Sequence, residues 1–90
     1  AHMKSAQIKT WYVYLLQCEN DMLYCGSTND LERRYAQHCA GKGAKFTKIN
    51  RPLELLAYRE FPDRSAACKV EAQLKKMPKH RKITWLKKDG

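Results

Sequence analysis

The chain has 90 residues, and its 18 lysines and arginines outnumber its 9 aspartates and glutamates, which leaves a formal net charge of +9. A chain of this length forms one domain with a small core, and no apolar run in it approaches the ~18 residues that a membrane-spanning helix needs. We therefore expect a cloning remnant and a disordered stretch at residues 1–10, then one domain at 11–88, in a cytoplasmic protein that is nucleoid-associated if bacterial.

The positive charge is concentrated in two segments. Residues 69–88 hold eight basic residues and one acid, and residues 41–51 hold four basic residues and no acid. Such a field attracts polyanions, and these segments carry too few apolar residues on one face to bind a membrane surface. We therefore expect DNA as the partner of a monomeric chain, with no membrane and no obligate small-molecule cofactor.

Two short β-rich runs at the start of the chain predict a hairpin. Residues 11–18 and 22–26 are apolar or aromatic, and the turn formers Glu19-Asn20-Asp21 separate them. Because side chains alternate between the faces of a strand, the length of this turn decides where the tyrosines lie. A loop of two or four residues places Tyr14 and Tyr24 on opposite faces, whereas a loop of three places them diagonally on one face. We predict the three-residue loop.

An amphipathic helix of about ten residues follows the hairpin. Asn29 or Asp30 is suited to cap its N-terminus, and Gly41 to end it. Within this helix Arg34 and His38 are i, i+4 neighbours that flank the apolar stripe. We therefore expect both side chains to emerge at the boundary between sheet and solvent.

The segment 41–51 has two glycines, four cations and no apolar period, which predicts a surface loop. The later elements are, in order, a third strand at 52–61, a helix at 66–77 capped by Asp63 or Ser65, and a last helix at about 79–87. The order β-β-α-β-α-α predicts an α+β fold: a small three-stranded sheet, at least partly antiparallel, flanked by helices.

Glu71 fits this pattern badly, because it lies on the edge of the apolar stripe that must face the sheet, where an unpaired carboxylate is costly. It either sits at the rim and pairs with a nearby lysine or arginine, or points into a cleft and holds a divalent metal. One carboxylate suffices for Mg²⁺ when phosphate oxygens and waters complete its coordination.

The four cysteines stand at wide, irregular spacings with no C-x-x-C pair. This spacing indicates small buried thiols, and it argues against a zinc site or a disulfide framework. The cysteines are Cys18, Cys25, Cys39 and Cys68.

Several positions match a known pattern in order and spacing: "YVY" at 12–14, "YCG" at 24–26, Arg34, His38 and Glu71. With them the chain resembles the GIY-YIG nuclease family, and most of all its small stand-alone YhbQ-like branch. The resemblance covers about residues 11–85, essentially the whole expected domain. It implies a three-stranded antiparallel sheet flanked by helices, and hydrolysis of a DNA phosphodiester with Mg²⁺ or Mn²⁺.

The resemblance also implies a role for each matching residue. Tyr14 and Tyr24 are the tyrosines of the two motifs, Arg34 stabilises the phosphate, His38 is the accessory histidine, and Glu71 is the metal ligand. Gly26 lets the backbone turn closely beside the phosphate. Tyr24, with Tyr14 or His38 assisting, would orient and deprotonate the attacking water, and Arg34 would stabilise the charge of the pentacovalent phosphate.

Two features depart from the family's pattern: Tyr12 stands in place of the first glycine, and no asparagine follows Glu71. The function we expect is endonuclease action on single-stranded, branched or damaged DNA in repair or recombination, with a protein partner supplying specificity. A non-catalytic DNA- or RNA-binding module on the same scaffold is the alternative. The candidate DNA-contacting cations are Arg33, Lys42, Lys45, Lys48, Arg51, Lys75, Lys79 and Arg81.

Overall fold

A three-stranded antiparallel sheet forms the middle of the structure, a computed structural model that describes residues 10–87. Its strands are β1 (Trp11–Cys18), β2 (Met22–Thr28) and β3 (Pro52–Phe61). They are arranged β2-β1-β3, so β1 is paired on both sides and β2 and β3 are edges. The predicted α+β class and antiparallel sheet are confirmed, and the expected N-terminal remnant at 1–10 lies almost wholly outside the described residues.

The hairpin turn has the predicted length. Cys18 pairs with Met22, so three residues, Glu19–Asp21, connect β1 to β2. Asn20 and Asp21 both have positive φ, 63° and 58°, a conformation that asparagine and aspartate tolerate better than most residues. Two adjacent residues of the right kind thus reverse the chain tightly, and the register that follows is the one expected for a three-residue loop.

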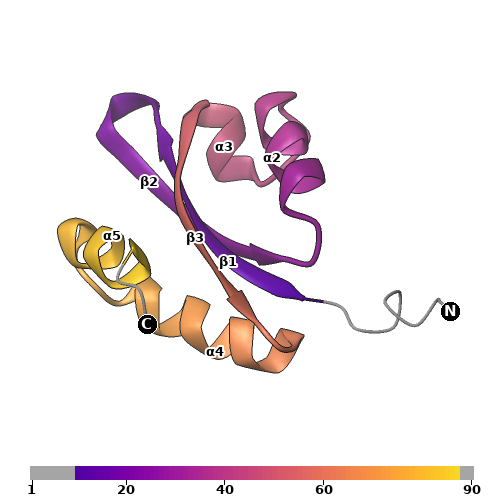
Figure 1. The fold of residues 1–90 in the computed structure, drawn as a ribbon. Helices are drawn as coiled ribbons and strands as arrows, with labels where there is room; N and C mark the ends of the chain where they lie inside the picture. The colour runs from indigo at the N-terminus through magenta and orange to yellow at the C-terminus, as the bar shows by residue number, and fades with distance from the viewer. Residues whose placement is uncertain (1–9, 88–90) are drawn as a thin grey trace, which may run out of the picture.

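The helices cover both faces of the sheet (Figure 1). On one face lie α2 (Leu31–Cys39) and α3 (Lys45–Ile49), and on the other α4 (Arg64–Lys75) and α5 (Lys79–Lys87). Of the alternative caps, the structure uses Asp30, which accepts from the Arg33 amide at 3.2 Å, and Asp63, which accepts from the Ala66 amide at 2.9 Å. Because Asp63 is the cap, α4 begins earlier than the predicted residue 66.

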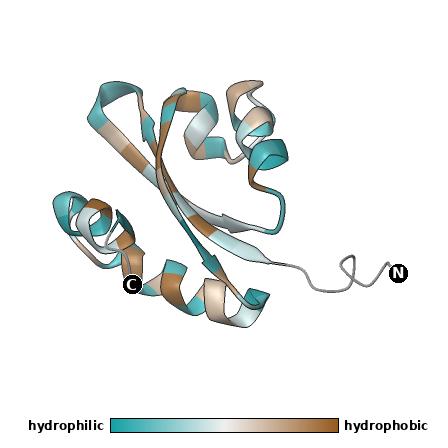
Figure 2. Cartoon of the chain, viewed as in Figure 1, coloured by the Kyte–Doolittle hydropathy of each residue, from teal (hydrophilic) through white to brown (hydrophobic). Residues whose placement is uncertain are grey.

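The core is divided by the sheet into two clusters. Under α4 and α5 the buried side chains are Val13, Leu15, Cys25, Ala67, Leu74 and Leu86. Under α2 and α3 they are Tyr14, Leu16 and Cys18, with Tyr24, Leu31, Tyr35, Phe46 and Leu55 packed against them. Figure 2 shows hydrophobic residues along the strands and at intervals in the helices, as expected of elements that bury one face each. The aromatic side chains are thus gathered mainly on the α2 face.

The cysteines divide between the interior and the surface. Cys18 and Cys25 are buried as predicted, but Cys39 and Cys68 are exposed, and all four are free thiols. The prediction of buried thiols is therefore wrong for the two helical cysteines, because Cys39 is at the exposed C-terminal end of α2 and Cys68 is on the solvent side of α4.

The prediction of a surface loop at 41–51 is wrong, because this segment contains α3 and contributes to the core. Thr47 is 1% exposed, and Phe46 packs against the ring of Tyr24 with a centroid separation of 5.7 Å. The helix is a single short turn in which Thr47 is buried and Phe46 is partly buried, and Lys45 and Lys48 are exposed. A segment this short shows no apolar period, so its burial is decided by what lies under it.

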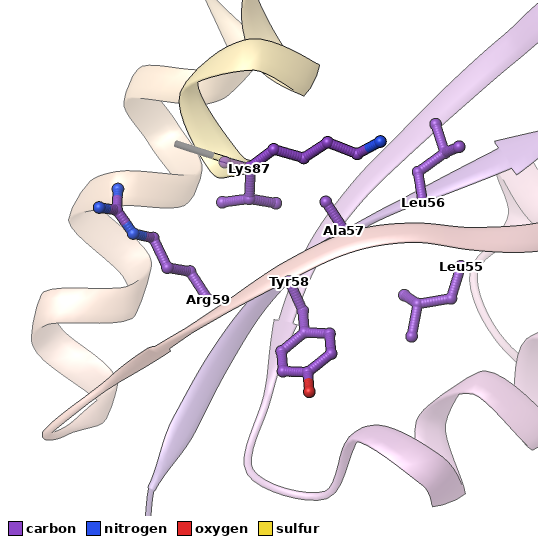
Figure 3. A pocket seen from close by; sticks show the side chains of 7 residues that line it. Leu55, Leu56, Ala57, Tyr58, Arg59 and Lys87 are labelled. Carbon is purple, nitrogen blue, oxygen red and sulfur yellow. The ribbon is translucent and has the colours of Figure 1, made fainter. Parts of the chain in front are cut away.

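The edge strand β3 carries a bulge. Its register with β1 shifts between Leu15 and Leu16, so one extra residue of β3 stands opposite this pair. As a result Leu55 and Tyr58 lie on one side of the strand and Leu56 and Ala57 on the other (Figure 3). An open cavity of about 360 Å³ follows this strand and reaches Lys87. It lies at the opposite edge of the sheet from Tyr24.

No helix in the described part of the chain is both long and apolar enough to span a membrane.

Candidate active site

The hairpin register places Tyr14 and Tyr24 on the same face of the sheet. Leu16 pairs with Tyr24, and Tyr14 pairs with Gly26, so the two tyrosines are diagonal neighbours on adjacent strands. Their ring centroids are 6.2 Å apart. The predicted pairing is confirmed, and it follows directly from the length of the turn.

Gly26 is required by the ring of Tyr14. A Cβ at this position would lie 2.6 Å from the Tyr14 hydroxyl oxygen and 2.9 Å from Cε2 of Tyr24. Both distances are shorter than real Cβ contacts allow. The space that the missing side chain leaves beside the backbone is thus filled by the tyrosines, whereas the family resemblance suggested clearance for a phosphate.

His38 completes the aromatic group. Its Nε2 lies 3.0 Å from the Tyr14 hydroxyl oxygen, and its ring centroid lies 4.9 Å from that of Tyr24. The side chain is 0% exposed, so the expectation that it emerges at the boundary between sheet and solvent is wrong. The physical reason is that the segment after α2 folds back over the ring, with Gly43 and Thr47 in contact with it.

Thr47 and Gly43 belong to the site but escaped the sequence analysis. The Thr47 hydroxyl lies 2.8 Å from Nδ1 of His38, and a Cβ on Gly43 would lie 2.3 Å from the same nitrogen. The interpretation of this segment as a surface loop hid both residues. The one signal was Phe46, an aromatic residue between cations, because Gly43 and Thr47 are equally common in solvated loops.

Burial controls the protonation of this pair. Burial raises the pKa of Tyr14 to about 12, the nearby Tyr24 adds to the rise, and the Arg34 guanidinium opposes it. Burial also lowers the pKa of His38 to about 4, and the positive charge of Arg34 lowers it further. Near neutral pH the resting site therefore holds a protonated tyrosine bonded to a neutral imidazole.

Arg34 lies at the mouth of this group. Its charge acts on both Tyr14 and His38, and its Nη1 donates to the Gln37 side chain at 3.0 Å. The guanidinium is half-buried and lines an open cavity of about 300 Å³ with Ser27 and Arg33. A phosphate entering here would meet an arginine held by the protein, next to the tyrosine hydroxyl.

Glu71 approaches the same edge strand from the other face of the sheet. Its Oε1 accepts from Ser27 of β2 at 2.7 Å, and its Oε2 lies 3.0 Å from the Lys75 ammonium. Its charge contributes to the raised pKa values of Tyr14 and of Cys25, after burial in both cases. The first alternative for Glu71, a carboxylate paired with a nearby lysine, is therefore observed, and its role as a metal ligand stays a prediction.

The comparisons with known proteins agree with this geometry. The model of the GIY-YIG catalytic domain matches residues 10–84. This chain belongs to the GIY-YIG family. A UPF0213 protein of Xanthomonas axonopodis pv. citri is 47% identical over 79 residues, which are 88% of this chain and 78% of the relative. A UPF0213 protein of Cupriavidus pinatubonensis is 45% identical over 80 residues, 89% of each chain.

A solved structure shares the fold. The solution NMR structure of the UPF0213 protein from Bacillus halodurans is 36% identical and superimposes with a TM-score of 0.52 over 84% of this chain and 81% of the other. The identification as a small YhbQ-like GIY-YIG protein, made from the motifs alone, is confirmed.

The GIY-YIG site offers a single carboxylate for a metal. Within residues 10–87 there is no group of three histidine, cysteine or acidic side chains that could enclose an ion. Glu71 with the Ser27 hydroxyl beside it nevertheless fits Mg²⁺ or Mn²⁺, because these ions retain several waters and take further oxygens from phosphates. The residues present therefore suit an ion that binds together with its phosphate substrate.

The candidate DNA-contacting cations of this GIY-YIG chain are distributed over both faces of the sheet. Lys79, the half-buried member, bonds to the backbone and carboxylate of Asp21 in the hairpin turn. Lys75 is exposed and is paired with Glu71. The exposed members are Arg33 on α2, Lys42, Lys45, Lys48 and Arg51 in or around α3, Lys75 at the end of α4, and Arg81 on α5.

Proposed function

We propose that this GIY-YIG protein is a metal-dependent endonuclease that hydrolyses phosphodiester bonds of single-stranded, branched or damaged DNA. The observation that carries the proposal is the buried hydrogen bond between Tyr14 and His38, with Tyr24 and Arg34 against it and Glu71 across the edge strand. A tyrosine hydroxyl bonded to a neutral imidazole is an arrangement that can pass a proton from one group to the other, as hydrolysis requires. The family's name for its domain, catalytic, supports the same choice.

The residues divide the chemistry between them. Tyr24, half-buried at the strand, orients the attacking water. Tyr14 and His38 assist by accepting its proton, and since the raised pKa of Tyr14 disfavours a free phenolate, the two act together. Arg34 stabilises the negative charge that develops on the phosphate. A divalent ion at Glu71 would supply Lewis-acid stabilisation of the phosphate and the leaving oxygen.

The basic residues of the 41–51 segment and of α5 would hold the strand by its phosphates, which accounts for the net charge of +9. The chain is proposed to act as a monomer in the cytoplasm, at the nucleoid if bacterial, in repair or recombination. A protein partner would supply specificity, because phosphate contacts position a strand but do not read its sequence.

The test is a cleavage assay on single-stranded, nicked and branched DNA with Mg²⁺ or Mn²⁺. We expect Glu71→Gln, which keeps the size and the hydrogen bond to Ser27, to lower the cleavage rate by at least about 10²-fold. Glu54→Gln removes one exposed carboxylate from the edge strand β3 and is the matched control. Undiminished cleavage by Glu71→Gln would contradict the metal-ligand assignment. Binding of all three substrates without cleavage by the wild type would favour the binding module instead.

A further inference from the structure

A chain of hydrogen bonds runs inward from Tyr14 and ends on the backbone. The Tyr14 hydroxyl oxygen lies 3.0 Å from Nε2 of His38, and Nδ1 of His38 lies 2.8 Å from the Thr47 hydroxyl oxygen. Thr47 in turn bonds to the carbonyl oxygen of Ala44 at 2.9 Å. The three side chains are all buried, with exposed fractions of 1% or less.

The Ala44 carbonyl, at the end of this series of hydrogen bonds, determines which atom donates in each of them. The carbonyl of Ala44 can only accept, so the Thr47 hydroxyl donates its one proton there. Its oxygen must then accept from Nδ1 of His38, which places the imidazole proton on Nδ1. Nε2 is left without a proton and accepts from Tyr14. Any other arrangement leaves one of these close buried contacts without a hydrogen, which is costly.

We propose that Thr47 is a positioning residue that holds His38 in the Nδ1-protonated tautomer, so that Nε2 accepts the Tyr14 proton and the Tyr14 oxygen is presented to the substrate as an acceptor. The inference rests on the proposed nuclease function of this site. It assigns a role to the short helix α3, which brings Thr47 against the ring.

Gly43 supports the same geometry. A Cβ at Gly43 would lie 2.3 Å from Nδ1 and 2.8 Å from Cε1 of His38, so the ring lies directly against this backbone. A side chain at residue 43 would therefore displace the ring, which in its present position directs Nδ1 to Thr47. Turning the ring over by 180° would put ring carbons in place of both nitrogens and break both hydrogen bonds at once.

The tautomer decides whether Tyr14 can act as a base. In the proposed step the Tyr14 oxygen takes a proton from the attacking water while its own proton passes to Nε2, leaving an imidazolium that still donates to Thr47. The water oxygen bonds to phosphorus, the bond from phosphorus to the leaving oxygen breaks, and that oxygen takes a proton from solvent. Tyr14 then releases to solvent the proton that it took from the water and takes its own proton back from Nε2, which restores the resting state. With a proton already on Nε2, the first transfer has no acceptor.

The test measures the tautomer directly in the full chain. In protein labelled with ¹⁵N-histidine, the His38 signals are identified by their loss in His38→Gln. We expect the wild type to show a protonated Nδ1 and an unprotonated Nε2. Thr47→Val, nearly isosteric, should shift His38 toward the Nε2-protonated form, and Thr47→Ser should keep the wild-type pattern. An Nε2-protonated wild type, or an unchanged pattern in Thr47→Val, would overturn the proposal.

Kinetics provide the second readout. We expect Thr47→Val to lower kcat by about 10²-fold with KM nearly unchanged, and Thr47→Ser to restore most of the rate. Thr84→Val is the matched control, because Thr84 also donates to a helix carbonyl, that of His80 at 3.0 Å, but is exposed on α5. If Thr47→Val fails to fold, the wild-type spectrum and Thr47→Ser still decide the tautomer. If no protein cleaves DNA, the proposed function fails and the tautomer measurement stands independently.

Discussion

Gly26 and Gly43 leave room for the rings of the site, whereas Gly41 is needed only for its backbone conformation. Gly26 and Gly43 would each bring a Cβ under 3.0 Å from Tyr14 or His38, whereas a Cβ on Gly41 would meet nothing within 4 Å. Gly41 instead has a positive φ of 77° after α2. Loss of each glycine therefore has a different consequence.

We expect Gly26→Ala to abolish cleavage, because the new Cβ displaces the Tyr14 hydroxyl, and to lower the free energy of unfolding by about 1–3 kcal/mol. Gly41→Ala should cost about 1–2 kcal/mol through backbone strain alone and should retain cleavage. Urea unfolding and the cleavage assay measure the two effects separately. Equal activities of the two variants would contradict the role of Gly26 in seating Tyr14.

His38 makes the stability of the protein depend on pH. Its pKa is lowered to about 4 by burial, so the unfolded chain binds a proton below about pH 6.5 while the folded protein does not. The free energy of unfolding should therefore fall as the pH drops from about 6.5 to 4, by roughly 3 kcal/mol in all, and this contribution should not change further below.

Urea unfolding at about pH 7, 5.5 and 4, with His38→Gln as the control, isolates this contribution because glutamine does not titrate. The wild type should lose stability faster than the variant over this interval. Parallel pH dependences of the two proteins would show that His38 titrates normally in the folded state.

At the scale of elements, the site depends on β2 being an edge strand with a helix on each side. Its residues alternate between the faces, so Tyr24 and Ser27 point toward α2 and α4 respectively. Two positions of the same strand, three residues apart, thus join the tyrosine–histidine pair on one face to Glu71 on the other. A central strand, paired on both sides, would leave less room for a phosphate between them.

The salt bridge from α4 should oppose metal binding. The Lys75 ammonium lies 3.0 Å from Oε2 of Glu71, where it competes with any cation for that oxygen. Because an exposed ion pair of this kind is worth about 0.2–1 kcal/mol, Lys75→Met should lower the half-saturating Mn²⁺ concentration by at most roughly fivefold. Paramagnetic broadening of the Ser27 amide signal measures this without DNA. Lys76→Met removes a neighbouring charge and should have a smaller effect.

At the scale of the whole molecule, the effect of the positive charge depends most on the salt concentration of the solvent. Binding of the protein to DNA should weaken as salt rises, by counterion release at each phosphate contact. The short helix α3 directs Lys45 and Lys48 to the surface beside the site, while Lys69 and Lys76 lie on and after α4. The first pair is therefore better placed to hold a strand that enters at Arg34.

We expect the double variant Lys45→Gln, Lys48→Gln to make the negative slope of log Kobs against log[salt] on duplex DNA shallower by about 1.8, the contribution of two contacts. Lys69→Gln with Lys76→Gln removes the same net charge and should change the slope less. Fluorescence titrations at several salt concentrations measure both. Equal slopes for the two double variants would show that charge alone, and no contact by α3, governs binding.

The sequence by itself determined the features that depend on near neighbours. The three-residue turn set the register of Tyr14 and Tyr24, and periodicity identified Glu71 as a carboxylate out of place. The sequence limited each helix cap to two nearby candidates, of which the structure uses Asp30 and Asp63. Strand alternation, capping and helical period are local, so a few adjacent residues are enough to predict them.

Only the tertiary structure decided the features that depend on segments distant in the chain. His38 is buried because α3 folds back over it, and its tautomer follows from Thr47, nine residues away, and from Tyr14, twenty-four residues away on another element. Ser27 reaches Glu71 across forty-four residues. Burial and proton position depend on all the side chains that surround a residue. These side chains come from separate elements, so the local sequence pattern does not predict them.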